Sequence, residues 1–276
     1  MKKRLILLAA LLLFVPAVCL TNAARAQEIR VTFFALDKAD AILITAPDGE
    51  RVLIDTGTNK DGKRLAERFG DEGIDALELM IVTHYDKDHV GGADKVLGAL
   101  DVSRVIMPQY EKQSAQYEDF LKALKKSKGT QVESLPAKAE TAITLACGAT
   151  LLITAAHETD YGADEENDFS LCVRLAYGDT SFLFPGDAES ARQLEILSEG
   201  DAACDVLKVP HHGKLHDASY VFLRAASPSI AYVPDGENEP ASPVLLAMLG
   251  ELGAEVYRTR DGELTVVSDG ERVWTD

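Results

Sequence analysis

Cysteine is scarce in this chain of 276 residues, which argues against a disulfide-stabilised scaffold. Outside the first 26 residues the cysteines are Cys147, Cys172 and Cys204. An odd number gives no disulfide framework, although one bridge could form after export, and the spacing fits no zinc-knuckle pattern. Cys172 lies in an apolar segment, 169–173, where we expect it to pack in a core strand.

Long apolar runs are also lacking after the N-terminus, so no later segment is expected to cross a membrane. The N-terminus itself has the pattern of a secretory signal peptide: basic residues at 2–4, an apolar run at 5–20, and Ala24-Arg25-Ala26 as a cleavage site. An uncleaved anchor is disfavoured because the run is short and Pro16 interrupts it. A lipid anchor at Cys19 is disfavoured because Val18 precedes it. We therefore expect a signal peptide at 1–26, an exported domain at 27–276, and no stable membrane association after cleavage.

Basic residues are few relative to acidic ones. The chain has 28 Lys and Arg against 45 Asp and Glu, a formal charge of −17. Loss of residues 1–26 removes four basic residues and no acidic ones, which gives −21. Such a surface disfavours general binding to nucleic acid or anionic membranes, although it leaves room for a local basic groove. A predicted helix at 117–128 carries a cluster of lysines, which we interpret as a solvated face, with a substrate-facing basic strip as the alternative: Lys122, Lys125, Lys126 and Lys128.

The chain shows no internal repeat and no low-complexity linker, which favours one domain. Alternating apolar residues and turn signals predict strands at 29–35, 41–46, 51–55, 79–83, 104–107, 151–155, 170–177, 180–184, 206–209, 255–258 and 264–267. Helices are expected at 63–70, in the segment before Leu77, and at 93–100, 117–128, 190–198 and 243–252. The order fits two packed halves with sheets inside and helices outside.

A short loop concentrates metal-binding side chains. His84, Asp86, Asp88 and His89 occur within six positions at the end of the apolar strand at 79–83. Carboxylates packed this densely repel one another unless a cation lies between them. The pair Gly91-Gly92 follows, which allows a tight turn and close backbone approach. The loop therefore predicts a divalent metal centre.

These residues resemble the metal loop of the metallo-β-lactamase superfamily, His-x-[His/Asp]-x-Asp-His. The flanking segments are similar to the soluble hydrolase domain of the competence protein ComEC and its stand-alone relatives. Nearly the whole mature chain takes part in the resemblance, through the segments 34–44, 53–57, 167–171, 184–188, 207–213 and 253–259. The resemblance implies an α/β fold of the four-layer αββα sandwich type, with the site between the sheet edges.

The resemblance also implies a centre of one or two divalent ions. It makes His84, Asp86 and His211 candidates for one ion and Asp88 and His89 candidates for a second, with a shared ligand between them. The bridging ligand would be Asp187, and the groups that line or support the centre would be Asp40, Asp55 and Asn167. Because Asp86 stands where many relatives have histidine, oxygen ligands are more numerous and manganese gains on zinc; both stay open.

Such a centre supports hydrolysis by a metal-bound hydroxide. Asp88 could orient the attacking oxygen. His212, His216 or Lys214 could protonate a leaving group or bind substrate phosphate; the alternative is that these three are ordinary surface side chains. We expect a phosphodiesterase or nuclease, with nucleic acid or a small phosphodiester as substrate. The sequence indicates no protein partner.

Two departures from the family pattern keep other functions open. The segment Asp37-Lys38-Ala39-Asp40 lacks the glycines and glutamine that usually precede the aspartate. The segment 239–243 lies where relatives often carry a histidine, for which His157 or His216 could substitute. The alternatives are hydrolysis of a small ester or lactone, and a non-catalytic binding protein on a decayed hydrolase scaffold.

Overall fold

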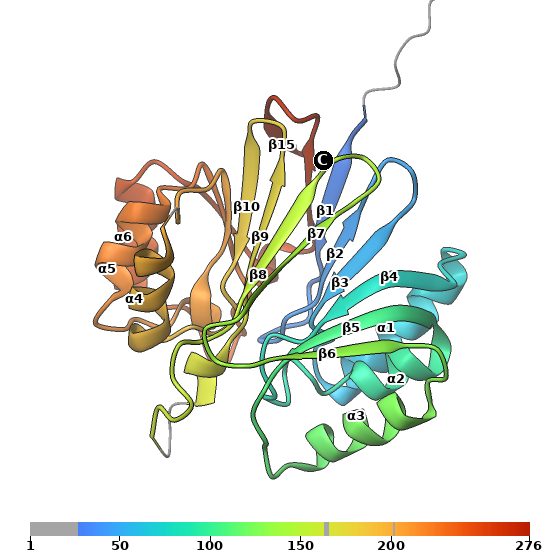
Figure 1. The fold of residues 1–276 in the computed structure, drawn as a ribbon. Helices are drawn as coiled ribbons and strands as arrows, with labels where there is room; N and C mark the ends of the chain where they lie inside the picture. The colour runs from blue at the N-terminus through green and yellow to red at the C-terminus, as the bar shows by residue number, and fades with distance from the viewer. Residues whose placement is uncertain (1–26, 163–165, 201) are drawn as a thin grey trace, which may run out of the picture.

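The computed structural model describes residues 27–162, 166–200 and 202–276. The predicted signal peptide at 1–26 lies outside these residues. Two sheets face each other at the centre of the molecule (Figure 1). The first has the strand order β15-β14-β1-β2-β3-β4-β5-β6, and the second has the order β13-β12-β11-β10-β9-β8-β7.

The strands of the first sheet are β1 (Ile29–Phe33), β2 (Ile42–Thr45), β3 (Arg51–Ile54), β4 (Ala76–Ile81), β5 (Asp101–Pro108), β6 (Gln131–Leu135), β14 (Leu264–Ser268) and β15 (Val273–Thr275). Those of the second are β7 (Glu140–Thr144), β8 (Thr150–Thr154), β9 (Cys172–Tyr177), β10 (Thr180–Phe184), β11 (Val206–Lys208), β12 (Ile230–Val233) and β13 (Glu255–Arg258). The α-helices are α1 (Asn59–Asp71), α2 (Ala93–Ala99), α3 (Ala115–Lys126), α4 (Ser190–Glu199), α5 (Ser219–Ala226) and α6 (Pro243–Glu251).

Helices cover the outer face of each sheet: α1–α3 lie on the first and α4–α6 on the second (Figure 1). Three apolar clusters match these layers. The largest lies between the sheets and includes Phe33 and Phe184; a second joins the first sheet to α1–α3, and a third joins the second sheet to α4–α6. The arrangement is the predicted four-layer αββα sandwich.

Parallel pairing brings the ends of several strands to one region. Strands β3, β4, β5 and β6 run parallel in the first sheet, as do β10, β11, β12 and β13 in the second. The carboxyl ends of parallel strands lie at the same edge, and chemistry is often located in the loops there. The backbone N–H of Leu171 donates to the carbonyl of Thr83 at 2.9 Å and thereby ties the two edges together.

Two helices approach each other through glycines. A Cβ built on Gly62 of α1 would lie 2.2 Å from the Cα of Gly92, and a Cβ on Gly91 would lie 2.1 Å from the carbonyl oxygen of Lys87. The tight turn and close backbone contact expected of Gly91-Gly92 are therefore confirmed. This contact fixes the metal loop against α1.

Replacing Gly62 by Ala is expected to destabilise the protein by about 1–3 kcal/mol, because backbone atoms must move to admit a methyl group. Gly98 in α2 is a matched control, since a Cβ there meets nothing within 4 Å. Gly98→Ala should leave stability unchanged or raise it by up to about 1 kcal/mol through helix propensity. Urea denaturation of the two variants measures the difference; equal effects would contradict the proposed close contact.

Most of the predicted elements are present, with boundaries shifted by a few residues. The expected hairpin at 41–55 is the antiparallel pair β2 and β3. The helix expected before Leu77 is wrong, because α1 ends at Asp71 and a turn leads directly into β4. Strands β6, β7, β12 and β15 and helix α5 were not anticipated.

Among the described residues, no disulfide joins Cys147, Cys172 or Cys204. Cys172 is buried in β9, as expected, and burial raises its pKa to about 12. Among the described residues, no helix combines the length and the apolar character that a membrane span requires.

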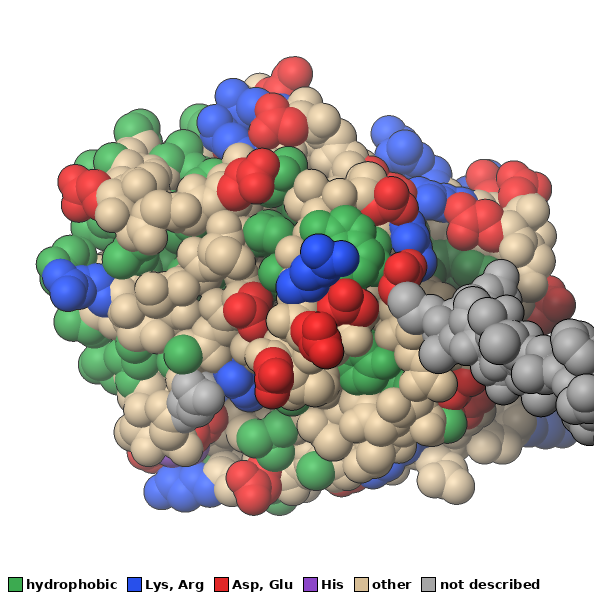
Figure 2. All heavy atoms as spheres, turned by 90° about the horizontal axis from the view of Figure 1, so that it is seen from above, with side chains coloured by type: hydrophobic (Ala, Val, Ile, Leu, Met, Phe, Trp, Pro, Cys, Tyr) green, Lys and Arg blue, Asp and Glu red, His purple; other side chains and the backbone are tan. Residues whose placement is uncertain are grey.

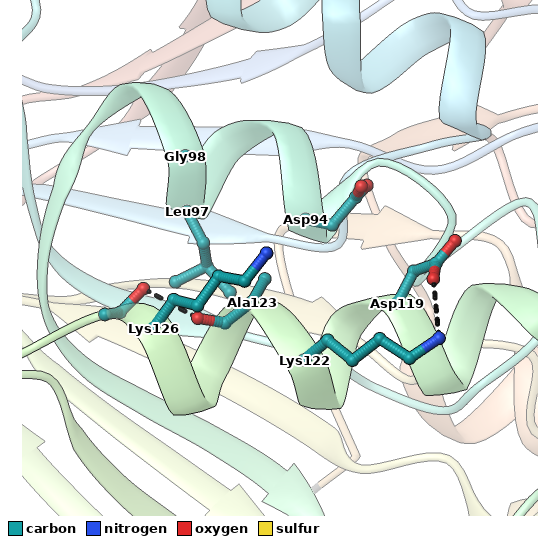
Figure 3. A pocket seen from close by; sticks show the side chains of 8 residues that line it. Asp94, Leu97, Gly98, Asp119, Lys122, Ala123 and Lys126 are labelled. Carbon is teal, nitrogen blue, oxygen red and sulfur yellow. Dashed lines mark hydrogen bonds and ion pairs between the residues drawn. The ribbon is translucent and has the colours of Figure 1, made fainter.

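The lysine cluster of α3 lies on an exposed surface. Lys122 contacts Asp119 at 3.2 Å, and a cavity of about 520 Å³ between α2 and α3 is bordered by Lys122, Lys126 and Asp94 (Figure 3). None of the predicted metal ligands lines this cavity. The contact of Lys122 with Asp119 and the separation of this cavity from the predicted ligands favour a solvated helix face over a substrate strip. Figure 2 shows the opposite face, seen from the top of Figure 1, on which basic side chains are interspersed with acidic and neutral ones.

Candidate metal centre

The site is assembled from the segments that follow four strands. Asp55 comes directly after β3, the loop of His84–His89 follows β4, Asp187 follows β10, and His212 follows β11. The backbone N–H of Asp55 donates to the carbonyl of Ile81 at 2.8 Å, which sets the two loops of the first sheet side by side. The side chains of five residues lie together in one group: His84, Asp88, His89, Asp187 and His212.

His84 is fully buried, and one of its ring nitrogens is unpaired. Its Nδ1 lies 3.1 Å from Thr83 Oγ1 and 3.4 Å from Ser170 Oγ. Nothing among the described residues is within hydrogen-bond distance of His84 Nε2. Burial, together with the nearby His89, lowers the pKa of His84 to about 4, so the ring is neutral and Nε2 offers a lone pair. A buried lone pair without a partner is the arrangement expected of a metal ligand.

Asp55 holds the two histidines of the loop in orientation. Its Oδ1 accepts from the backbone N–H of Thr83 at 2.8 Å, and its Oδ2 accepts from Thr83 Oγ1 at 2.6 Å and from His89 Nδ1 at 2.8 Å. Because the Thr83 hydroxyl proton points to Asp55, the hydroxyl oxygen is free to accept from His84 Nδ1. A single carboxylate therefore directs the Nε2 lone pairs of both His84 and His89 inward.

Asp55→Asn is expected to weaken divalent-metal affinity by about 10–100-fold. The amide has one acceptor oxygen instead of two and no negative charge, so it holds Thr83 and His89 less firmly. Isothermal titration with Zn²⁺ or Mn²⁺ measures the change. Asp61→Asn is the control, since Asp61 caps α1 through Thr58 and touches none of these histidines. Equal affinities of wild type and Asp55→Asn would refute this role.

His212 supplies a third imidazole to the same group. Its Nδ1 is 2.9 Å from the carbonyl oxygen of Pro234, and its Nε2 lies 2.9 Å from Asp187 Oδ2, 3.5 Å from Asp88 Oδ2 and 3.4 Å from His89 Nε2. The ring is fully buried. With Nδ1 donating to a backbone carbonyl, Nε2 is the nitrogen available to a metal ion.

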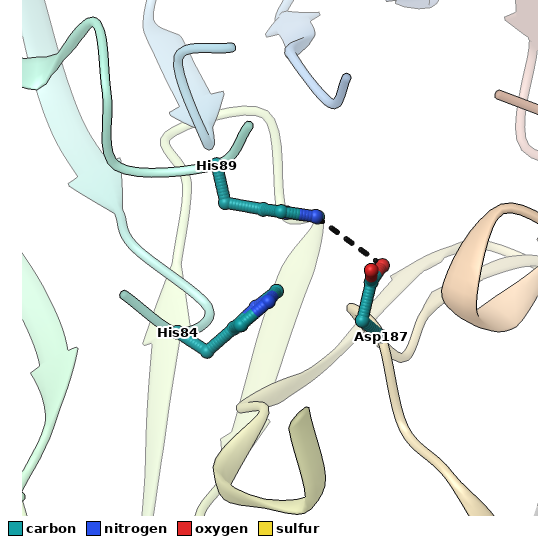
Figure 4. Close-up of side chains that lie close together, drawn as sticks. All are labelled: His84, His89 and Asp187. Carbon is teal, nitrogen blue, oxygen red and sulfur yellow. Dashed lines mark ion pairs between the residues drawn. The ribbon is translucent and has the colours of Figure 1, made fainter. Parts of the chain in front are cut away.

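Asp187 lies at the centre of the group. Figure 4 shows it facing His89 and His84, and its Oδ1 is 3.3 Å from His89 Nε2. Burial opposes ionisation of this carboxyl, but the charges of His212, Lys208 and His89 outweigh it and hold its pKa well below the usual range. The reverse holds for His89: burial lowers its pKa, whereas Asp187, Asp40 and Asp55 raise it well above normal. The buried negative charge therefore draws positive charge to this point.

Lys208, a buried lysine that the sequence analysis did not identify, offsets the negative charge of two aspartates at the site. Lys208 Nζ donates to the carbonyl oxygen of Gly186 at 2.7 Å, to Asp187 Oδ1 at 3.0 Å and to Asp40 Oδ2 at 2.5 Å. Asp40 also lies 3.7 Å from His89 Nδ1. Together with Asp55 and His89, it forms a further set of possible ligand atoms that lie within 4.8 Å of one another. The only sequence signal for Lys208 was a charged residue inside the apolar strand β11.

The residues present fit a divalent ion. His84, His89 and Asp187 each offer a ligand atom within 4.8 Å of the others, and so do Asp88, His89 and His212. The two groups share His89 and together supply three imidazoles, each with its outer nitrogen already occupied, and two carboxylates. This is a donor set that zinc and manganese accept.

Two of the predicted ligands lie elsewhere. Asp86 belongs to neither group; its carboxylate accepts from Lys112 Nζ, which also pairs with Glu166. His211 was expected to share an ion with His84 and Asp86, but its ring joins Glu189 and His216 instead. The cause is the backbone: His211 and His212 both adopt left-handed conformations, at φ +43° and +53°, so adjacent rings enter different groups.

The remaining candidates lie around this second group. Asn167 Nδ2 donates to Glu189 Oε1 at 2.9 Å, and Lys214 Nζ lies 2.9 Å from His211 Nε2. His157, considered as a substitute ligand, pairs with Glu199 at 3.0 Å, away from both groups. Glu189 was not predicted, because an acidic residue before a helix is usually read as a cap.

Fold and site together define a metallohydrolase-type sandwich, and sequence comparison identifies its family. Residues 36–234 match the metallo-beta-lactamase superfamily. The chain therefore belongs to this superfamily, whose fold binds divalent metals.

Two curated bacterial proteins are similar to this chain. Recombination protein 2 of Haemophilus influenzae is 29% identical over 198 residues, which cover 70% of this chain and 22% of that protein. ComE operon protein 3 of Bacillus subtilis is 26% identical over 230 residues, which cover 77% of this chain and 29% of that protein. The chain thus spans less than a third of the length of either relative. The resemblance to ComEC-type competence proteins is confirmed.

Solved structures support the fold. CmlA, a diiron β-hydroxylase from Streptomyces venezuelae, aligns with a TM-score of 0.55 at 13% identity, covering 91% of this chain and 54% of that chain. A mutant of the CmlA β-hydroxylase gives a TM-score of 0.57 at 14% identity, covering 86% of this chain and 53% of that chain. At this identity the likeness concerns the fold alone.

Proposed function

We propose that this chain is an exported, metal-dependent hydrolase of phosphodiester bonds. The observation that carries the proposal is the buried, unpartnered Nε2 of His84 beside His89 and Asp187, in a group that His212 and Asp88 complete. A divalent ion held there would supply Lewis acidity toward a phosphoryl oxygen and an ionisable water near neutral pH. The proposed ligands are His84, Asp88, His89, Asp187 and His212, with zinc or manganese as the ion.

The chain's own residues prepare the site in three ways. Asp55 fixes the tautomers of His84 and His89, so no reorientation of these rings is required when an ion binds. Burial of the three imidazoles keeps the electrostatic interactions strong. Asp88 lies at the edge of the group, and its position suits it to orient an attacking oxygen as well as to bind metal.

Lysines beside the group favour an anionic substrate. Lys38 Nζ lies 3.7 Å from Asp88 and 3.0 Å from Glu239, Lys112 pairs with Asp86, and Lys214 contacts His211. Lys38 and Lys112 are each paired with two carboxylates, so these ammonium groups offset part of the negative charge around the centre. They suit a phosphate group, whereas the acidic surface disfavours a long nucleic acid track. A short or single-stranded phosphodiester is therefore the proposed substrate class, in keeping with a relative named for recombination.

The test is hydrolysis of bis(4-nitrophenyl) phosphate and of single-stranded and linear duplex DNA, with added Mn²⁺ or Zn²⁺ and with chelator. We expect turnover of the small diester and of single-stranded DNA, abolished by chelator and restored by metal. Absence of metal-dependent cleavage of every phosphodiester would overturn the nuclease proposal, and turnover of lactones or esters alone would move the assignment to small-molecule hydrolysis.

Export is proposed from the sequence pattern at residues 1–26. The full chain expressed in a bacterial host should be recovered outside the cytoplasm, with Gln27 as its first residue. N-terminal sequencing checks this, and a chain that retains residues 1–26 in the cytoplasm would contradict it.

A further inference from the structure

A second group of metal-binding side chains lies next to the first. Glu189 directly precedes α4, His211 lies in the turn after β11, and His216 precedes α5. His211 Nδ1 is 3.0 Å from His216 Nε2 and 3.1 Å from Glu189 Oε1, and the three ligand atoms lie within 4.8 Å of one another. Two nitrogens bound to one ion at ~2.1 Å lie roughly 3–3.4 Å apart, so the observed spacing matches shared coordination.

The backbone that creates this group is strained. His211 and His212 are consecutive non-glycine residues in the left-handed region, at φ +43° and +53°, a conformation that costs of order 1–3 kcal/mol per residue. It places the two ring centroids 6.1 Å apart at 69°, with His212 in the inner group and His211 in the outer one. Strain of this kind persists where the surrounding structure maintains it, often at a ligand site.

Hydrogen bonds alone satisfy the outer group poorly. His211 Nδ1 lies 3.1 Å from Glu189 Oε1 and 3.0 Å from His216 Nε2, and one N–H can serve these two partners only through a shared bond. The ring planes of His211 and His216 are nearly parallel, at 17°, with centroids 5.0 Å apart, and Nδ1 of His211 lies 3.0 Å from Nε2 of His216. A cation at that point would accept a lone pair from each of the three atoms.

We propose that Glu189, His211 and His216 form a second, outer site for a divalent ion of the zinc class. Two imidazoles and one carboxylate, with a further position open to water, are a donor set that zinc uses in proteins. Asn167, which donates to Glu189 Oε1 at 2.9 Å, orients the carboxylate from behind. The outer site does not depend on what the inner centre hydrolyses.

Lys214 competes with this ion. Its ammonium group lies 2.9 Å from His211 Nε2, which must carry the ring proton once Nδ1 binds a cation. Lys214 is exposed and can rotate into solvent when the ion binds. Lys214→Met should therefore raise zinc affinity at the outer site roughly fivefold, the Coulomb effect of one unit charge a few ångströms away in water.

The experiment counts zinc ions bound to the full chain by equilibrium dialysis and elemental mass spectrometry. His216→Gln should lower the count by one ion per chain, and Glu189→Gln, a second variant in case the first folds poorly, should do the same. His157→Gln is the matched control, because His157 also pairs with a glutamate, Glu199, but has no second imidazole beside it. It should leave the count unchanged.

A variant of the inner centre separates the two proposals. His84→Ala with Asp187→Asn should retain one zinc that His216→Gln then removes, whatever hydrolytic activity remains. Equal zinc counts and affinities for wild type, His216→Gln and Glu189→Gln would overturn the outer site while leaving the proposed hydrolase intact.

Discussion

Asp187→Asn is expected to lower metal-dependent phosphodiester hydrolysis by roughly 10³-fold or more, while the protein stays folded. Asp187 contacts His89 at 3.3 Å and His212 at 2.9 Å and so lies between the two halves of the inner centre. An amide of the same shape removes the negative charge that a cation requires there. Loss of a ligand that contacts both halves should forfeit several kcal/mol of transition-state stabilisation, which corresponds to this factor.

The measurement is kcat/KM for bis(4-nitrophenyl) phosphate at saturating Mn²⁺, together with metal affinity. Asp61→Asn serves as control, because it neutralises another buried aspartate that only caps α1. We expect it to retain activity within a few-fold. Activity of Asp187→Asn close to that of wild type would show that the reaction does not use this centre.

Lys208→Met is expected to destabilise the metal-free protein by about 3–5 kcal/mol, the range for removing one partner of a buried charge pair. Lys208 is fully buried and contacts Asp40 and Asp187. Its loss removes the ammonium group that contacts both buried carboxylates, and it leaves only the neighbouring imidazoles to compensate their charge. Because native domains are stable by only about 5–15 kcal/mol, this is a large fraction of the total.

A divalent ion should reverse much of this loss. Lys208→Met raises the negative charge around the inner centre, so Mn²⁺ or Zn²⁺ should bind more tightly and stabilise the variant more than wild type. The double variant Lys208→Met with Asp40→Asn should recover part of the stability without metal. Urea denaturation with and without ion tests both; a loss below 1 kcal/mol in the absence of metal would contradict the buried pairing.

The sequence predicted the elements of the centre that depend on local order. The density of ligands from His84 to His89 is readable in the loop itself, whereas the roles of Asp55 and Asp187 came from the family resemblance of the segments that contain them. The four-layer sandwich followed from the alternation of strands and helices together with the family resemblance. Helix α5 and the strands β6, β7 and β12 were missed because their apolar patterns are short.

What the sequence could not give depends on backbone direction and on distant pairing. Whether His211 or His212 enters the inner centre is decided by two left-handed residues that no local pattern requires. Asp86 is turned toward Lys112, 26 positions later, a pairing that exists only once β5 and its following loop are in place. From the sequence alone Lys208 would be assigned to an exposed position of a strand, whereas in the folded protein it is buried.

Metal content most directly tests the inner centre. The full chain, purified without chelator and dialysed against Mn²⁺ or Zn²⁺, should retain at least one tightly bound ion per chain by elemental mass spectrometry. A variant with His84→Ala, His89→Ala and Asp187→Asn should lose the inner ion while keeping its circular dichroism spectrum. Retention of the same number of ions by this triple variant, or the absence of bound metal in the wild type, would contradict the proposed centre.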